Sequence, residues 1–171
     1  SLLKHGYSRK NIYEKITDKD IINALQRRRK TKHKRIYGYS DFAYAVLALI
    51  VKKVTNQNYS SLLEDFIKKD LELTNTKLIL NDNKNKYEVK KRKIIDYWKW
   101  NLNNPYLYSG GVISNIQDML KYLIIQIESD KQYITNAHNV SEDVKCKNHI
   151  KICKGWHTYD KSHQLWHVGG V

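Results

Sequence analysis

The feature that most constrains the fold is a strongly apolar stretch, Phe42 to Val51, inside a helix predicted from Asp41 to Val54. Apolar residues cover nearly all faces of this helix, which is typical of a helix buried within a larger domain. The stretch is about half as long as the roughly 20 apolar residues that span a bilayer. We therefore expect a protein core around it and no stable membrane insertion of this segment, in keeping with the mean hydropathy of −0.68.

Two other N-terminal helices are predicted from capping signals. One runs from Asp18 to Gln26, where Thr17 and Asp20 resemble a capping box. The other runs from Leu62 to about Leu71 and is opened by Ser61 with Glu64, after a turn at Asn56-Gln57-Asn58.

The clearest helix follows the break at Gly110-Gly111. Ser114 and Gln117 predict its capping box. One apolar face repeats at helical spacing and consists of Ile116, Met119, Leu120, Leu123, Ile124 and Ile127. Ile94 to Trp100 lie between the helix that ends near Leu71 and the break at Gly110-Gly111. These residues either pack in the core or line or cover a cleft.

The C-terminal part has strand character, with short runs at Gly155-Trp156-His157 and Leu165-Trp166-His167 joined through Asp160-Lys161-Ser162. Helices first and antiparallel strands last predict an α+β fold.

The net charge of +14 invites a nucleic-acid hypothesis, but its distribution argues against one. Only six of the 31 basic residues are arginine, the residue suited to bidentate phosphate contacts. The one dense block, Arg27 to Arg35, is typical of a solvated loop. We expect no nucleic-acid partner.

Two cysteines, Cys146 and Cys153, leave three alternatives open. With His149 and His157 they have a spacing that a zinc site could use. A disulfide would suit an exported protein, and otherwise both are unpaired thiols. Ile150 and Ile152, which alternate with polar residues, favour a plain strand here.

Four strings in order resemble the serine β-lactamase-related family of class C β-lactamases, penicillin-binding DD-peptidases and related esterases. They are Leu2 to Ser8, Tyr39 to Thr55, Tyr108 to Leu123, and His167 to Gly170. The second resembles the family's Tyr-x-Asn motif and the helix after it, and the last resembles its Lys/His-x-Gly strand.

The resemblance implies a β-lactamase/transpeptidase-like fold, in which a helical region and an antiparallel sheet covered by helices enclose the active site. Residues 1–113 would form a mainly helical region and residues 114–171 a helix and strands, all within one partial domain, residues 1–171. It implies hydrolysis of an amide or ester of a small-molecule or peptide substrate through an acyl-serine. It also implies no cofactor and no metal, and a location in the cell envelope or outside the cell. The alternative is an inactive homologue that binds cell-wall or peptide ligands.

Residue by residue, the resemblance implies that Tyr39 takes part in proton transfers beside the nucleophile. His167 would support the substrate's anionic end and the proton network. The backbone N–H of Gly170 would complete the oxyanion hole, and Gly169 would leave room for a substrate along the strand.

Asp41 departs from the family pattern, which has asparagine there. An ionised aspartate accepts hydrogen bonds but cannot donate one to a substrate carbonyl. Either the site takes a neutral or cationic substrate, or activity is lost and Asp41 is a helix cap.

The family's nucleophile is the serine of a Ser-x-x-Lys motif on a buried helix upstream of the first string. Ser1-Leu2-Leu3-Lys4 matches formally, but the residues after Lys4 are polar and have no apolar period. We therefore expect the nucleophile outside this chain, which is then an internal fragment.

Overall fold

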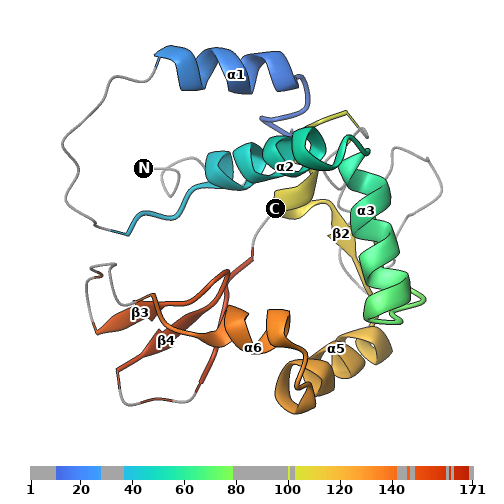
Figure 1. Cartoon of the computed structure of the whole chain (residues 1–171), viewed down its shortest axis with the longest axis vertical. Helices are drawn as coiled ribbons and strands as arrows, with labels where there is room; N and C mark the ends of the chain where they lie inside the picture. The colour runs from blue at the N-terminus through green and yellow to red at the C-terminus, as the bar shows by residue number, and fades with distance from the viewer. Residues whose placement is uncertain are drawn as a thin grey trace, which may run out of the picture. The chain divides into compact units, whose positions relative to one another are not determined.

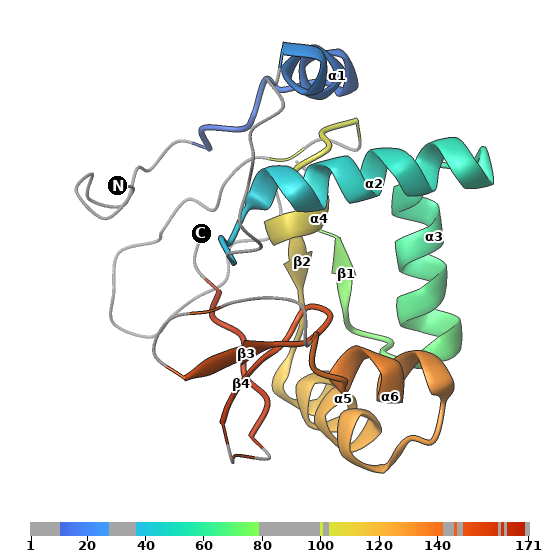
Figure 2. The same cartoon turned by 60° about the vertical axis from the view of Figure 1, so that its left-hand side comes forward.

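The computed structural model describes residues 11–27, 37–78, 100, 103–141, 146, 149–160, 162 and 164–169. The chain folds as two compact units. The first comprises Ser1–Arg28, Asp41–Asn115 and Val171, and the second Arg29–Ser40 and Ile116–Gly170. The boundary between Ser40 and Asp41 means that the Tyr39-Ser40-Asp41 triplet contributes residues to both units. Figure 1 labels most of the elements and colours them by residue number, and Figure 2 also labels α4 and β1.

Within the described residues, the first unit holds four helices, a π-helical turn and a small sheet. Its elements are α1 (Asp18–Arg27), α2 (Asp41–Thr55), α3 (Tyr59–Asp65), the π-helical turn η2 (Phe66–Asp70), β1 (Lys77–Leu78), α4 (Leu107–Gly110) and β2 (Val112–Ile113). Strands β1 and β2 pair antiparallel, with Lys77 opposite Ile113 and Leu78 opposite Val112 (Figure 2).

The core of the first unit lies where α1 and α4 pack against α2. Its buried residues are Ile21, Ala45, Leu49, Leu78, Trp100, Tyr106 and Leu107. Trp100 is only 2% exposed. Trp100 therefore packs in the core, as one of the two alternatives for Ile94 to Trp100 expected. The other residues of this run lie outside the described residues.

The predicted helix from Asp18 is confirmed as α1, and so is its capping box. The backbone N–H of Thr17 donates to Asp20 Oδ2 at 2.9 Å, and the Asp20 N–H donates to Thr17 Oγ1 at 3.4 Å. These bonds satisfy donors that a helix start otherwise leaves unpaired.

The predicted start of the next helix at Leu62, with Ser61 as its cap, is wrong. Helix α3 begins at Tyr59, and its cap is Asn58, whose side chain accepts from the N–H of Ser60 at 3.2 Å. An Asx residue that closes a turn also caps the helix after it, so the turn predicted at Asn58 and the cap are one feature.

Helix α2 forms as predicted, but the expectation that nearly all of its faces are buried is wrong for the described part of the chain. Ala45, Ala48 and Leu49 are buried. Leu47 and Ile50 are half exposed and Val54 is 80% exposed. Only the face towards the core of the first unit is covered.

The second unit contains α5 (Ile116–Glu128), α6 (Gln132–His138), β3 (Ile150–Ile152) and β4 (His157–Tyr159). Strands β3 and β4 pair antiparallel, with Ile152 opposite His157. Cys153 and Trp156 close the hairpin with an N–H to carbonyl bond of 2.8 Å. Gly155, predicted as part of a strand, lies in this turn with φ of 86°, a conformation that favours glycine.

Helix α5 is confirmed, and its apolar face is exposed in the described structure. Exposure along this face runs from 49% at Met119 to 73% at Ile127. Ser114, the predicted cap, shares a 2.7 Å hydrogen bond between its hydroxyl and that of Thr76 within the first unit.

Helix α6 was not predicted. Its seven residues include Thr and Asn, which are weak helix formers, and Lys131 makes no side-chain cap bond. The side chain of Ile134 is buried, and a 2.9 Å bond between His138 Nε2 and Gln126 Oε1 links α6 to α5. In the part of the chain that the structure describes, helices occur with two small antiparallel sheets, which confirms the predicted α+β class.

Candidate active site

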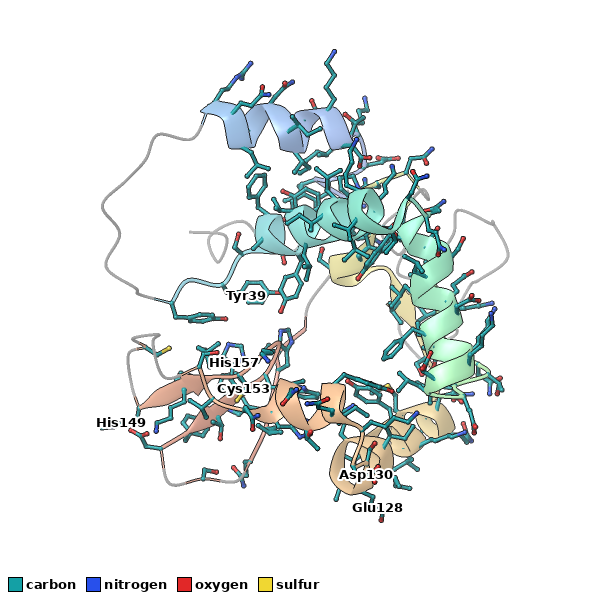
Figure 3. The ribbon with its side chains drawn as sticks, in the orientation of Figure 1. Tyr39, Glu128, Asp130, His149, Cys153 and His157 are labelled. Carbon is teal, nitrogen blue, oxygen red and sulfur yellow. The ribbon has the colours of Figure 1, made fainter. Side chains whose placement is uncertain are left out.

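The structure brings Tyr39 and His167 together within the second unit. Their ring centroids lie 5.9 Å apart at an interplanar angle of 55°. Both side chains are exposed, Tyr39 to 52%. The tyrosine and the histidine singled out from opposite ends of the sequence therefore present a phenol and an imidazole side by side on an accessible surface. Figure 3 labels Tyr39 on the segment that precedes α2.

His167 is positioned by the strand pairing of the residue before it. The N–H of His157 donates to the carbonyl of Trp166 at 2.9 Å, and the Trp166 N–H donates back at 2.9 Å. This isolated bridge places Trp166 beside β4, so the chain carrying His167 continues the β3–β4 hairpin as a third antiparallel segment.

His157, considered from the sequence only as a possible zinc ligand and as part of a strand, is a further residue of this site. Its Nε2 is 2.8 Å from the hydroxyl of Tyr37. Its ring stacks on Trp166 with centroids 4.6 Å apart and lies 5.7 Å from the ring of His167. The sequence signal for this contact is the pair of short strand runs that end in His157 and His167, because a hairpin between them brings the two residues close together. Figure 3 labels His157.

The electrostatics of this cluster favour a neutral His157. Burial lowers the pKa of His157, and the adjacent His167 lowers it further, while a backbone hydrogen bond with Trp166 opposes both. Desolvation disfavours the charged form of an imidazole, and a second positive charge nearby acts in the same direction.

Asp41 lies in the first unit, where its carboxylate has a partner. The hydroxyl of Tyr13 donates to Asp41 Oδ2 at 3.1 Å. Tyr13 stacks on Tyr106 with centroids 4.1 Å apart, and the amide of Asn104 donates to the Tyr13 carbonyl at 2.6 Å. Burial raises the pKa of Tyr106, and the negative charge of Asp41 adds to this rise.

Gly169 is exposed and has open space around it. A Cβ placed on Gly169 meets no heavy atom within 4 Å. The described protein therefore leaves this position clear, as a substrate lying along the strand would require. Gly170 lies outside the described residues, as do the predicted first string, Leu2 to Ser8, and the Ser1-Leu2-Leu3-Lys4 match.

The zinc and disulfide alternatives for the two cysteines are not supported. Cys146 and Cys153 are free thiols, and Cys153 is buried, which raises its pKa. Among the described residues, no group of three or more His, Cys, Asp or Glu side chains is placed to hold a metal ion. His149 is instead largely exposed and faces Asp160, with 3.8 Å between Nδ1 and Oδ2.

Comparison with known proteins identifies the family. The sequence model of the family described as Beta-lactamase matches residues 7–170, almost the whole chain. The chain belongs to the Beta-lactamase family. The predicted resemblance to serine β-lactamase-related proteins is therefore confirmed.

Solved structures with this fold share little sequence with the chain. A β-lactamase/D-alanine carboxypeptidase from Yersinia pestis, complexed with citrate, superposes with a TM-score of 0.65 at 17% identity, over 90% of this chain and 47% of that one. A β-lactamase/D-alanine carboxypeptidase from Pseudomonas syringae superposes with a TM-score of 0.64 at 12% identity, over 90% of this chain and 45% of that one. These Beta-lactamase family neighbours confirm the predicted β-lactamase/transpeptidase-like fold.

Among curated relatives, Protein flp of Staphylococcus aureus MRSA252 is 26% identical over 141 residues, which is 78% of this chain and 28% of that protein. Protein flp of strain N315 is 25% identical over the same shares. The chain thus spans less than a third of the length of these relatives. In the described part of this Beta-lactamase family chain, no helix is long and apolar enough to cross a membrane.

Proposed function

We propose that the protein containing this chain is a serine hydrolase of the β-lactamase/DD-peptidase type. It acts on an amide or ester bond of a small-molecule or peptide substrate. The observation that carries this proposal is the contact between Tyr39 and His167, the two motif residues, in one compact unit of a Beta-lactamase family chain.

The proposed reaction has two steps. A serine oxygen attacks the acyl carbon, and the bond to the leaving amine or alcohol breaks as that group takes up a proton. Water then attacks the acyl-serine ester, which releases the acid and returns the proton to the serine. The nucleophile lies outside these 171 residues in this proposal, on a Ser-x-x-Lys motif that precedes Ser1.

Tyr39 takes part in the proton transfers of both steps. A phenol with a reference pKa near 10 needs nearby cations to act as a base, and the lysine of Ser-x-x-Lys would supply one. His167, in ring contact with Tyr39, supports this network and the substrate's polar end. The N–H of Gly170 stabilises the oxyanion, and Gly169 leaves the space for the substrate.

The charge of Asp41 bears on the substrate. An ionised carboxylate that already accepts from Tyr13 cannot donate to a substrate carbonyl as an amide would. We therefore propose that the preferred substrates are neutral or cationic next to the scissile bond. We also propose a location in the cell envelope or outside the cell, which membership of the Beta-lactamase family supports, and expect no nucleic-acid partner and no cofactor.

The same observation at Asp41 favours one alternative, an inactive homologue that binds cell-wall or peptide ligands. If the only role of Asp41 is to accept the hydrogen bond from Tyr13, it stabilises the first unit and takes no part in a reaction.

The deciding experiment uses the full-length protein, a fluorescent penicillin and a neutral chromogenic ester. Hydrolysis with a covalent serine adduct is expected, and Tyr39→Phe and His167→Gln should each lower the rate at least tenfold. Tyr133→Phe on α6 removes a phenol elsewhere in the same unit and serves as the matched control. Saturable binding without adduct or turnover would replace the hydrolase with the binding protein.

A further inference from the structure

The two candidate residues Tyr39 and His167 are each next to a residue that contacts one imidazole, that of His157. Tyr37, two residues before Tyr39, bonds His157 Nε2 through its hydroxyl at 2.8 Å. Trp166, immediately before His167, stacks on the His157 ring with centroids 4.6 Å apart and an angle of 20°. One side chain on β4 thus contacts both segments that carry the candidate pair.

The contact with Trp166 is set by the backbone. His157 and Trp166 exchange two N–H to carbonyl bonds of 2.9 Å, the arrangement of a directly opposed antiparallel pair. Side chains of such a pair lie on the same face of the sheet, which accounts for the stacking of the two rings. The ring of Tyr159 stacks on Trp166 as well, at 5.7 Å.

The contact with Tyr37 holds a segment that has no regular secondary structure. Residues 37–40 are neither helix nor strand. A hydrogen bond between the Tyr37 hydroxyl and His157 Nε2 on β4, with the T-shaped contact of the two rings at 5.4 Å, restricts where this segment lies. Tyr39 is in the same four-residue segment and so depends on that restriction.

The buried nitrogen of His157 decides its protonation. Nδ1 is buried and has no hydrogen-bond partner among the described residues, and the same is true of Nε1 of Trp166, which is itself a donor. An added proton on Nδ1 would place an unpaired, charged N–H in a buried position, which is costly. The imidazole is therefore neutral.

The tautomer follows from the same environment. A buried donor without an acceptor is rarer than a buried acceptor without a donor. Nδ1 is then the unprotonated nitrogen, and the Nε2–H donates to the hydroxyl oxygen of Tyr37. Among the described residues, the titratable groups in contact with His157 are Tyr37, on the segment before α2, and His167, which follows Trp166. A neutral His157 adds no positive charge beside His167.

We propose that His157 is a positioning residue, held as the neutral Nε2–H tautomer, that fixes Tyr37 and Trp166 and through them the contact between Tyr39 and His167. The catalytic consequence rests on the proposed hydrolase function. The positioning itself does not, because it is measured without turnover.

The first test is nitrogen-15 NMR of the histidine rings in the unmodified chain. The proposal expects the Nε2–H pattern for His157 at neutral pH, and a pKa below the ordinary histidine value. An Nδ1–H pattern, or a doubly protonated ring at pH 7, would overturn it. No variant is needed, so this test does not depend on the folding of a mutant.

The second test compares three variants by the nuclear Overhauser effects between the rings of Tyr39 and His167. Tyr37→Phe and His157→Phe both remove the Tyr37–His157 bond and keep an aromatic ring, so each should weaken these effects. Tyr159→Phe removes a phenol from the same cluster but no bond to His157, and should leave them unchanged. Unaltered effects in both of the first two variants would refute the positioning role.

The third test measures turnover by the full-length protein. Tyr37→Phe and His157→Phe should lower kcat/KM about threefold to tenfold, mainly through kcat, and Tyr159→Phe should not. If the unmodified protein shows no turnover, the hydrolase proposal fails while the ring contacts still decide the positioning. If turnover is normal in both variants although the contacts are lost, the positioning has no catalytic role.

Discussion

At the scale of single residues, the carboxylate of Asp41 and the imidazole of His157 each have a tyrosine hydroxyl as hydrogen-bond partner. Tyr13 donates to Asp41 in the first unit, and Tyr37 bonds His157 in the second. Neither tyrosine belongs to a motif, and 13 tyrosines in the sequence offer no means of choosing between them. The motif residues Tyr39 and His167 could be paired from the sequence because a family pattern relates them, whereas these partners depend on tertiary contacts.

The first prediction at this scale concerns substrate selectivity. In the full-length protein, Asp41→Asn should raise kcat/KM for substrates with a carboxylate next to the scissile bond by roughly tenfold or more. The substitution removes a like charge and restores an amide donor. A neutral ester of similar shape should gain less, and both substrates are measured in both proteins.

Tyr13→Phe is the control for that experiment, since it removes the hydrogen bond but keeps the charge of Asp41. It should produce no comparable gain for the carboxylate substrate. Equal changes for the two substrates in Asp41→Asn would mean that Asp41 does not face the substrate and that its bond to Tyr13 is its role.

The second prediction concerns the pH dependence of stability. Because the pKa of His157 is lowered in the folded chain, the unfolded chain binds its proton first as the pH falls. The contribution of His157 to stability is therefore complete above the unfolded histidine pKa of about 6.5 and is lost below it. Urea titrations at pH 7.5 and 5.5 should show a smaller loss of stability in His157→Phe than in the unmodified chain. An equal loss in both proteins would contradict the lowered pKa.

At the scale of elements, helices that carry capping residues or an apolar repeat at helical spacing could be predicted from the sequence. Helices α1, α2 and α5 follow from such signals. Helix α6 has neither a side-chain cap nor a clean period and is held by Ile134 and by the His138–Gln126 bond, which sequence patterns do not contain. The π-helical turn η2 extends α3 as far as Asp70, close to the predicted end of that helix.

The third prediction separates the true cap of α3 from the predicted one. Asn58→Ala should lower the free energy of unfolding by about 1 kcal/mol, because it removes the acceptor for the Ser60 N–H and hydroxyl. Ser61→Ala, also at an exposed position, should change it by less than about 0.5 kcal/mol. Chemical denaturation of both variants checks this, and a larger effect at Ser61 would restore the predicted cap.

The fourth prediction uses two glycines with opposite surroundings. A Cβ on Gly111 would lie 2.6 Å from the backbone oxygen of Leu107, so Gly111→Ala should destabilise the first unit by about 1 to 3 kcal/mol. Gly169→Ala has open space and should leave stability unchanged, but should reduce turnover if the substrate lies along that strand. Thermal unfolding and ester hydrolysis measure the two effects, and normal turnover in Gly169→Ala would place the substrate elsewhere.

At the scale of the whole molecule, the α+β class and the family fold could be predicted because four strings occur in the family's order. Which helix faces are buried could not be predicted from the sequence. Val54 on α2 and Ile127 on α5 belong to apolar faces that the described residues leave exposed. Periodicity identifies such faces but not the element that covers them. The proposed reaction likewise needs a nucleophile, which the proposal places on a Ser-x-x-Lys motif upstream of Ser1.

The last prediction concerns that nucleophile. The 171-residue chain by itself should form no covalent adduct with a fluorescent penicillin or a fluorophosphonate, although it contains the Tyr39–His167 contact. The full-length protein should form one adduct per chain, on the serine of a Ser-x-x-Lys motif encoded upstream of Ser1, because acyl transfer requires a nucleophile as well as groups that move its proton. Intact-mass and peptide mass spectrometry locate the adduct. A stoichiometric adduct on Ser1 would instead make Ser1 and Lys4 the catalytic pair. A complete upstream sequence without Ser-x-x-Lys would leave the ligand-binding homologue as the function of this fold.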